Sequence, residues 1–222
     1  MHALLIDVLA CPRCTPESGL VLRSDIMHER RIVEGALACP ICETHYPVHR
    51  GIAWLRFERE TGTHAMHRAS DHPCDEQSIR IAALLGAAEP LGFILLLGPA
   101  ACAAVALARM VEGTEIITDA SHSPEPGGAD AVSRIAIGHR LPVLARKLRG
   151  IWLSGEHADD LLEEAARALH PLGRLVLEPA PADTAARLEA VGLRVVARED
   201  RTVLAVHSTG PQIASSRGPS LS

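Results

Sequence analysis

Four cysteines in two matched pairs are the residues of this chain best suited to chemistry, and the chemistry they suggest is metal binding. Two residues separate Cys11 from Cys14 and Cys39 from Cys42, and 24 residues lie between the pairs. This spacing lets both thiolates of a tight turn point at one ion, and two such turns complete the tetrahedral S4 set of structural zinc. The interval is slightly longer than usual, which a longer hairpin can absorb. Two disulfides or four ordinary buried thiols are the alternative.

A zinc ion held by four cysteines has no open position for water or substrate, so we expect a structural and not a catalytic metal. The net charge is −5 and the chain has no basic stripe, which disfavours a zinc-ribbon nucleic-acid protein. The start, MHALLIDVLACP, has no basic region before its short apolar run, and no segment reaches 18 uninterrupted apolar residues. We therefore expect a cytoplasmic protein that binds neither nucleic acid nor membrane directly, in a compartment that keeps thiols reduced.

The elements that must position the cysteines form a small first module over residues 1–57. We predict a short helix over 4–9, strands over 20–22 and 31–39, and a final turn and strand over 46–55. A module of this size has little core. Zinc binding would therefore supply most of its folding free energy, on the order of 10 kcal/mol.

The segments "LLIDVLACPRC", "CPIC" and "YPVHRGIAWL" resemble the small zinc-ribbon proteins that activate tRNA, rRNA and translation-factor methyltransferases. The resemblance covers about 55 residues; besides the four cysteines, the matching positions are Pro12, Pro40, Tyr46, Pro47, Gly51 and Ile52. It implies a ribbon that docks on a methyltransferase, covers its apolar surface and stabilises it. The resemblance therefore implies a protein partner for the ribbon.

A polar segment without periodicity, residues 58–78, is the expected linker, and residues 79–208 form the second module. Residues 209–222 are rich in Ser, Gly and Pro and are expected to be a disordered tail. His64, His67, His72 and Cys74 fall within eleven residues of the linker. A second metal site is conceivable there, but the spacings fit no common ligand set, so we favour a histidine-containing linker.

The second module alternates apolar strands with helices. We predict strands over 93–97, 115–118, 133–137, 150–153, 174–178, 193–198 and 202–207, the last two as an antiparallel pair. Helices are predicted over 79–88, 100–110, 159–169 and 182–191, with a turn at 171–173. This order is typical of an α/β fold with a doubly wound, mostly parallel, seven-stranded sheet. Such sheets bind ligands at the carboxyl ends of their strands.

The segments "FILLLGPAACAAVALA", "EIITDAS", "GHRLPV" and "LLEEAARALHPLGRLVLEP" resemble class I S-adenosylmethionine-dependent methyltransferases over about 125 residues. The resemblance implies a loop after the first strand that holds the cofactor, here at Gly98 and Ala100. It also implies an acidic residue that binds the ribose hydroxyls at the end of the second strand. Asp119, 21 residues after Gly98, matches that position. A carboxylate there can accept hydrogen bonds from both hydroxyls; a strand-end cap is the alternative role.

Three residues depart from the cofactor motif of that family. Leu96 holds the acidic position, and Ala100 and Cys102 stand where later glycines are usual. Their side chains would occupy space that glycines leave for the ligand, although glycine-poor loops occur in active members. No catalytic residue is assigned. Glu156 and His157 lie at a plausible cleft edge and could serve as general base or metal ligand, but they are better explained as solvated residues before a helix.

Two hypotheses follow. The chain is either a methyltransferase fused to its own zinc-ribbon activator, or a catalytically inactive methyltransferase-like protein that binds or stabilises another protein. Fusion would raise the effective concentration of the activator without new contacts. Asp119 favours the enzyme, whereas Leu96, Ala100 and Cys102 favour the inactive partner. Fold-level resemblance cannot decide, because activity depends on the site.

Overall fold

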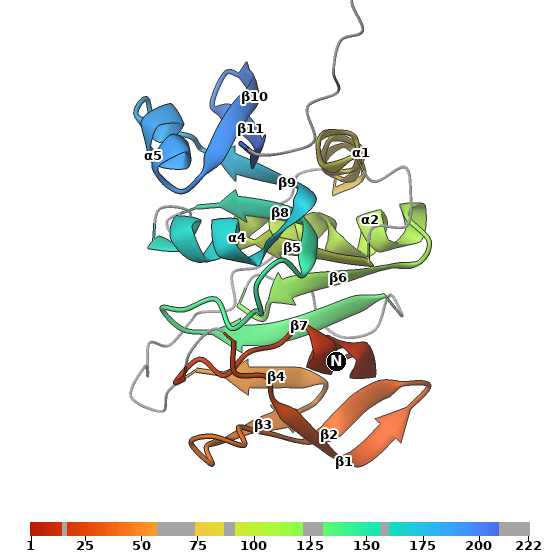
Figure 1. The fold of residues 1–222 in the computed structure, drawn as a ribbon. Coiled ribbons are helices and arrows are strands. Elements are labelled where there is room, and N and C mark those ends of the chain that lie inside the picture. The colour runs from red at the N-terminus through yellow and green to blue at the C-terminus, as the bar shows by residue number, and fades with distance from the viewer. Residues whose placement is uncertain (15–16, 57–73, 87–91, 122–130, 156–159, 209–222) are drawn as a thin grey trace, which may run out of the picture.

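The fold is built on one continuous sheet of eleven strands with helices on both faces (Figure 1). This computed structural model describes residues 1–14, 17–56, 74–86, 92–121, 131–155 and 160–208. The strands lie in the order β1-β2-β3-β4-β7-β6-β5-β8-β9-β11-β10. Residues 58–73 of the linker predicted over 58–78, and the predicted tail over 209–222, lie outside the described residues.

The bounds of the elements agree in most places with the sequence predictions. The strands are β1 (Val21–His28), β2 (Arg31–Ala38), β3 (His45–His49), β4 (Ile52–Leu55), β5 (Gly92–Leu97), β6 (Thr114–Asp119), β7 (Val132–Ile137), β8 (Leu148–Ser154), β9 (Leu169–Glu178), β10 (Leu193–Glu199) and β11 (Thr202–His207). The helices are α1 (Cys74–Leu85), α2 (Ala104–Met110), α4 (Leu162–Ala168) and α5 (Thr184–Ala190), with 3-10 helices η1 (Ala3–Asp7) and η2 (Gly98–Ala103).

Several local predictions need correction, beginning with the strand predicted over 20–22, which is β1 over Val21–His28. Helix α1 begins at Cys74, five residues before the predicted start and inside the segment assigned to the linker. The predicted helix over 100–110 is a 3-10 helix followed by α2, because the chain leaves β5 through a tight turn at Gly98. The turn predicted at 171–173 lies within β9, which already begins at Leu169.

The seven C-terminal strands form a doubly wound sheet. Strands β7, β6, β5, β8 and β9 pair in parallel, and β11 returns antiparallel to β9 before β10 completes the edge. The central strands are buried on both faces, which explains their uninterrupted apolar sequences. The order changes direction between β5 and β8, so the carboxyl ends of these strands mark the switch point, where ligands bind in such folds.

The ribbon is not a separate sheet, and this is the main correction to the predicted fold class. The α/β class is confirmed, but the expected seven-stranded sheet is extended by β1–β4 into one mixed sheet. Strand β4 pairs in parallel with β7, from Ile52 opposite Arg134 to Leu55 opposite Ile137. Edge strands carry unpaired N–H and C=O groups. The pairing of β4 with β7 covers one such edge on each part.

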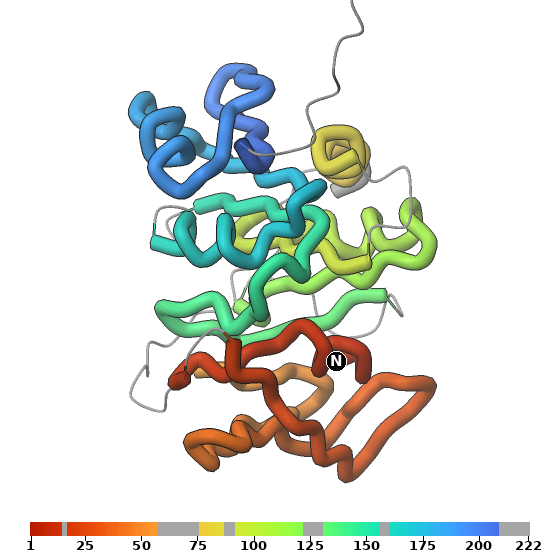
Figure 2. Tube along the Cα trace, in the orientation of Figure 1, coloured from red at the N-terminus to blue at the C-terminus, as the bar shows by residue number. Residues whose placement is uncertain are grey.

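Alternate residues of the central strands face two different apolar cores. On one face, Ile94 and Leu96 of β5 pack with residues of α1 and α2. On the other, Leu95 and Leu97 belong to a cluster that includes α4 and α5, and also the ribbon residue Leu5. Figure 2 shows the N-terminal segment of the ribbon lying against the strand β7 region. The ribbon and the C-terminal sheet thus share one hydrophobic core.

Within the described part of the chain, every helix is too short or too polar to cross a membrane.

Candidate metal centre and candidate cofactor edge

The four cysteines predicted as metal ligands meet at one point. Their sulfurs all lie within 4.8 Å of one another, and none is in a disulfide. Two of the Sγ–Sγ distances, Cys11 to Cys42 and Cys14 to Cys39, are 3.7 Å. A tetrahedron of sulfurs about 2.3 Å from a zinc ion has edges of about 3.8 Å. The cluster therefore has the size and the donor set that fit a tetrahedral zinc ion.

Backbone hydrogen bonds shape the turn that carries each cysteine pair. In the first turn, Cys11 N donates to Ser18 O at 2.7 Å. In the second, Cys39 N donates to Thr44 O at 2.9 Å and Glu43 N donates to Cys39 O at 3.0 Å, with Glu43 at a φ of 57°. The two turns face each other because β2 leads directly into the second one and an isolated bridge, Ala10 to Gly19, closes the first.

Polar neighbours prepare the sulfurs for metal binding. Thr44 lies beside Cys42, with its Oγ1 3.2 Å from the sulfur. Hydrogen bonds from the Thr44 hydroxyl and backbone amide lower the pKa of Cys42 to about 6. Hydrogen bonding to Cys42, followed by burial and its other sulfur neighbours, raises the pKa of Cys14. Cys42 is thus the thiol that ionises readily, and a cation is needed to bring Cys14 to the thiolate.

Tyr46 adds a contact that the spacing of the cysteines did not predict. Its hydroxyl lies 3.2 Å from Cys11 Sγ, and its side chain is buried. Burial, followed by the hydrogen bond to Cys11, raises the pKa of Tyr46, so the phenol stays protonated and can donate to a thiolate. The sequence signal was present, because Tyr46 and Thr44 closely follow Cys42, but the two residues were not assigned this role.

The first cysteine turn also contacts the C-terminal sheet. Ala10 N donates to Pro142 O at 2.9 Å, and Leu144 N donates to Val8 O at 2.8 Å. Arg140 Nη1 lies 3.4 Å from the carbonyl oxygens of Pro12 and of Cys14. A cavity of about 60 Å³ remains between the turn and this β7–β8 connection. The metal centre is therefore joined by hydrogen bonds to the segment that links β7 to β8.

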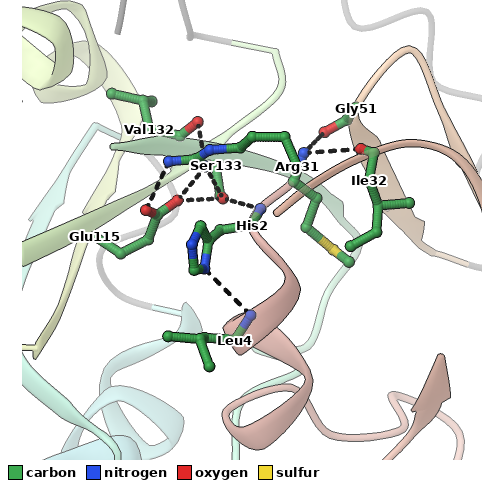
Figure 3. A network of polar contacts seen from close by, with 9 residues as sticks. His2, Leu4, Arg31, Ile32, Gly51, Glu115, Val132 and Ser133 are labelled. Carbon is green, nitrogen blue, oxygen red and sulfur yellow. Dashed lines mark hydrogen bonds and ion pairs between the residues drawn. The ribbon is translucent and has the colours of Figure 1, made fainter. Parts of the chain in front are cut away.

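A second junction surrounds the N-terminus of the chain (Figure 3). The Met1 amino group donates to Gly51 O at 2.7 Å, and burial lowers its pKa to about 5. Arg31 of β2 forms a bidentate ion pair with Glu115 of β6, at 2.6 and 2.9 Å, and also contacts Ser133 of β7 at 3.1 Å. This network joins the ribbon to two strands of the C-terminal sheet.

Replacing Arg31 with Met is expected to lower the free energy of unfolding by about 2 kcal/mol, because it leaves the largely buried Glu115 carboxylate without its cationic partner. The measurement is urea unfolding of the Arg31→Met protein. The control is the Arg31→Met/Glu115→Gln double variant, which removes the unpaired charge and should recover part of the loss. A double variant no more stable than Arg31→Met alone would contradict the assignment.

The structure places the predicted cofactor residues at the switch point. Gly98 follows β5, Ala100 lies in η2, and Asp119 ends β6, the neighbour of β5. Glu156 and His157 lie outside the described residues. Asp119 is 9% exposed, and the Ser121 hydroxyl donates to its carboxylate. Gly98 and Asp119 thus lie at the same edge of the sheet, where the predicted strand ends had placed them.

Gly98, in the loop after β5, lies against Ser154 of β8. Gly98 has a φ of +71°, and a Cβ there would lie 2.0 Å from Ser154 O. Ser154, at the end of β8, also donates from Oγ to Leu97 O at 2.6 Å and accepts from Ala100 N at 3.1 Å. The glycine permits close contact between β5 and β8, and a backbone amide at the start of η2 is satisfied internally by Ser154.

The residues that depart from the cofactor motif are buried. Leu96 and Ala100 are 0% exposed and Cys102 is 8% exposed. Leu96 lies between Thr118 and Trp152 in the sheet, and Thr118 Oγ1 and Trp152 Nε1 have no hydrogen-bond partner among the described residues. Leu96 has no polar atom that could accept from either group. The buried Leu96 therefore offers no acceptor for the polar amino-acid portion of S-adenosylmethionine at this position.

Solved structures similar in part to this chain include the [4+2]-cyclase SpnF (17% identity, TM-score 0.47). The antibiotic-resistance methyltransferase Kmr shares 14% identity, with a TM-score of 0.41. A TehB-like S-adenosylmethionine-dependent methyltransferase from Corynebacterium glutamicum also shares 14%, with a TM-score of 0.43. The matches cover 57%, 59% and 62% of this chain, and 59%, 93% and 89% of those chains, so less than two thirds of SpnF is spanned.

The ribbon has a match of its own. A search of curated proteins finds no match for the chain. The family described as Trm112p-like protein matches residues 2–51, a segment that contains all four clustered cysteines and strands β1–β3. The N-terminal part of this chain is therefore a Trm112p-like zinc ribbon.

Proposed function

We propose that this chain is a catalytically inactive, methyltransferase-like protein that is stabilised by its own zinc ribbon and acts as a binding or stabilising partner of another protein. The observation that carries the proposal is the packing of the cofactor edge. The position that Gly98 leaves open is filled by Ser154, and the acidic position holds the buried Leu96. The two-part organisation, with a ribbon over 1–57 and a methyltransferase-like part over 79–208, belongs to this proposal.

The arrangement of the sheet supports the methyltransferase-like part of the proposal. Its seven C-terminal strands wind in both directions from β5 and end in an antiparallel pair, as the sequence pattern predicts. The ribbon would then stabilise this sheet within one chain, by pairing β4 with β7 and by sharing a core. A covalent connection keeps the two parts together at any protein concentration.

Zinc is the metal we propose for the cysteine cluster. Thiolate ligands select zinc among the common structural metals, and four of them leave no position for a substrate. The ion would hold the turn that contacts the β7–β8 connection through Pro142 and Arg140. Its role in this proposal is to maintain the surface on which the two parts meet.

A second candidate function, an S-adenosylmethionine-dependent methyltransferase, is favoured by Asp119. Its carboxylate lies at the carboxyl end of β6, next to the switch point, where it could accept from ribose hydroxyls. If the cofactor binds, the residues to hold it would be Gly98, Ala100 and Asp119. S-adenosylmethionine would supply the methyl group, and these residues would bind and orient it.

Titration of the zinc-loaded protein with S-adenosylmethionine in a calorimeter separates the two functions. We expect no binding heat at millimolar ligand, because buried side chains and Ser154 occupy the edge. The control is Asp119→Ala, which should behave as the unmodified protein does. Micromolar binding that is lost in Asp119→Ala would overturn the proposal and favour the second candidate function, a methyltransferase.

A further inference from the structure

The eleven-stranded sheet ends at β1, whose outer edge has no strand beside it in the described structure (Figure 1). Such an edge presents N–H and C=O groups that can pair with another strand, and proteins usually protect it with charges, bulges or short strands. Strand β1 is eight residues long. It is therefore long enough to pair with a second strand over its whole length.

Strand β1 exposes three large apolar side chains. Val21 is 57% exposed, Ile26 is 47% exposed and Met27 is 55% exposed. Apolar side chains at this end of the sheet lose contact with water if a second strand covers them. The other terminal strand, β10, differs, because it carries Arg194 and Arg198 on either side of Val196.

The sequence of β1 is complementary to itself in the antiparallel direction. A two-fold axis through Ser24 places Val21 opposite Met27 and Arg23 opposite Asp25 of a second copy. Opposite charges stabilise directly opposed positions of an antiparallel pair, and apolar pairs do the same. The same axis through Val196 of β10 would instead oppose Arg194 and Arg198, a like-charge pair.

We propose that two copies of this chain associate through an antiparallel pairing of their β1 strands, centred on Ser24, which joins the two sheets into one. The interface is isologous, because every contact occurs twice. In a single copy, Arg23 and Asp25 are 74% and 54% exposed and form an ion pair at 3.5 Å. In the dimer, each of them also faces the opposite charge of the second copy.

A bulge lies close to the proposed axis. The register of β1 against β2 shifts between Ser24 and Ile26 and again between Ile26 and Met27, so Asp25 of β1 and Val33 of β2 have no opposite residue and the register is restored at Met27. Because the axis passes through Ser24, the two bulges are related by symmetry and bend both strands alike. Bulges can also discourage the pairing of edge strands. The mass of the unmodified protein in solution therefore decides whether β1 pairs with a second copy.

The experiment is sedimentation velocity of the full-length, zinc-loaded chain, whose monomer mass is 23.7 kDa. The unmodified protein should sediment with twice that mass at high micromolar concentration. Arg23→Asp and Asp25→Arg should each dimerise at least about tenfold more weakly, because each replaces two opposite-charge pairs with two like-charge pairs. Far-ultraviolet circular dichroism and zinc content should stay unchanged, because both side chains are exposed.

Mixing the two variants provides the sharpest test. An Arg23→Asp chain paired with an Asp25→Arg chain has opposite charges at both positions, so an equimolar mixture should dimerise more strongly than either variant does alone. A monomeric unmodified protein would overturn the proposal. So would single variants that dimerise as strongly as the unmodified protein, or a mixture that stays monomeric.

Discussion

The Cys39→Ser protein is expected to lose its zinc and the fold of the ribbon. A serine hydroxyl would not replace the Cys39 thiolate as a zinc ligand. Because Cys39 is buried, a water molecule could take the place of the thiolate only if the site opened. The ribbon would lose a metal-binding contribution to folding on the order of 10 kcal/mol. We expect the zinc content, measured by plasma mass spectrometry after dialysis, to fall from one equivalent per chain to background.

Cys102→Ser is the matched control for this change. Cys102 is also a buried cysteine, but it is not part of the cluster, and its Sγ is 3.3 Å from Gln77 Oε1. Its replacement should leave the zinc content unchanged. An unchanged zinc content in Cys39→Ser as well would contradict the assignment of four sulfur ligands.

The metal cluster could be predicted from sequence because its determinants are local. Two residues between cysteines fix the geometry of each turn, and a hairpin brings the two turns together. The neighbours Thr44 and Tyr46 also lie close in sequence, yet their role depends on side-chain directions that the spacing does not give. Local patterns thus gave the ligands but not the groups around them.

The continuous sheet could not be predicted because β4 and β7 lie far apart in the chain. Nothing in either segment specifies the other as its partner, although each is apolar enough to be buried. One signal was present in β4, where Ile52, Ala53, Trp54 and Leu55 are all apolar. Such a run is typical of a strand covered on both faces, which a small free-standing ribbon does not provide.

The region of the predicted cofactor residues could be predicted only in part. The loss of the acidic residue at Leu96 and of later glycines was visible in the sequence. The close approach of Gly98 to Ser154 was not, because it depends on the pairing of β5 with β8. Gly98 stays a predicted cofactor residue, and in the structure its missing side chain also makes room for the backbone of Ser154.

The second large effect is expected for Leu5→Ala, which should lower the free energy of unfolding of the whole chain by about 3 kcal/mol. Leu5 is 0% exposed and belongs to the core shared by the ribbon and the C-terminal sheet. The matched control is Leu4→Ala, because Leu4 is the preceding residue of the same 3-10 helix and is 53% exposed. Its replacement should change the free energy of unfolding by less than about 0.5 kcal/mol.

The two tryptophans can show whether the two parts unfold together. Trp54 lies in the ribbon strand β4, and Trp152 lies in β8 of the C-terminal sheet. Single-tryptophan chains made with Trp54→Phe or Trp152→Phe would report each part by fluorescence during urea unfolding. In each single-tryptophan background, Leu5→Ala should shift the midpoint by the same amount, because a shared core makes unfolding cooperative. A shift confined to the chain that retains Trp54 would show that the ribbon unfolds alone and would contradict the shared core.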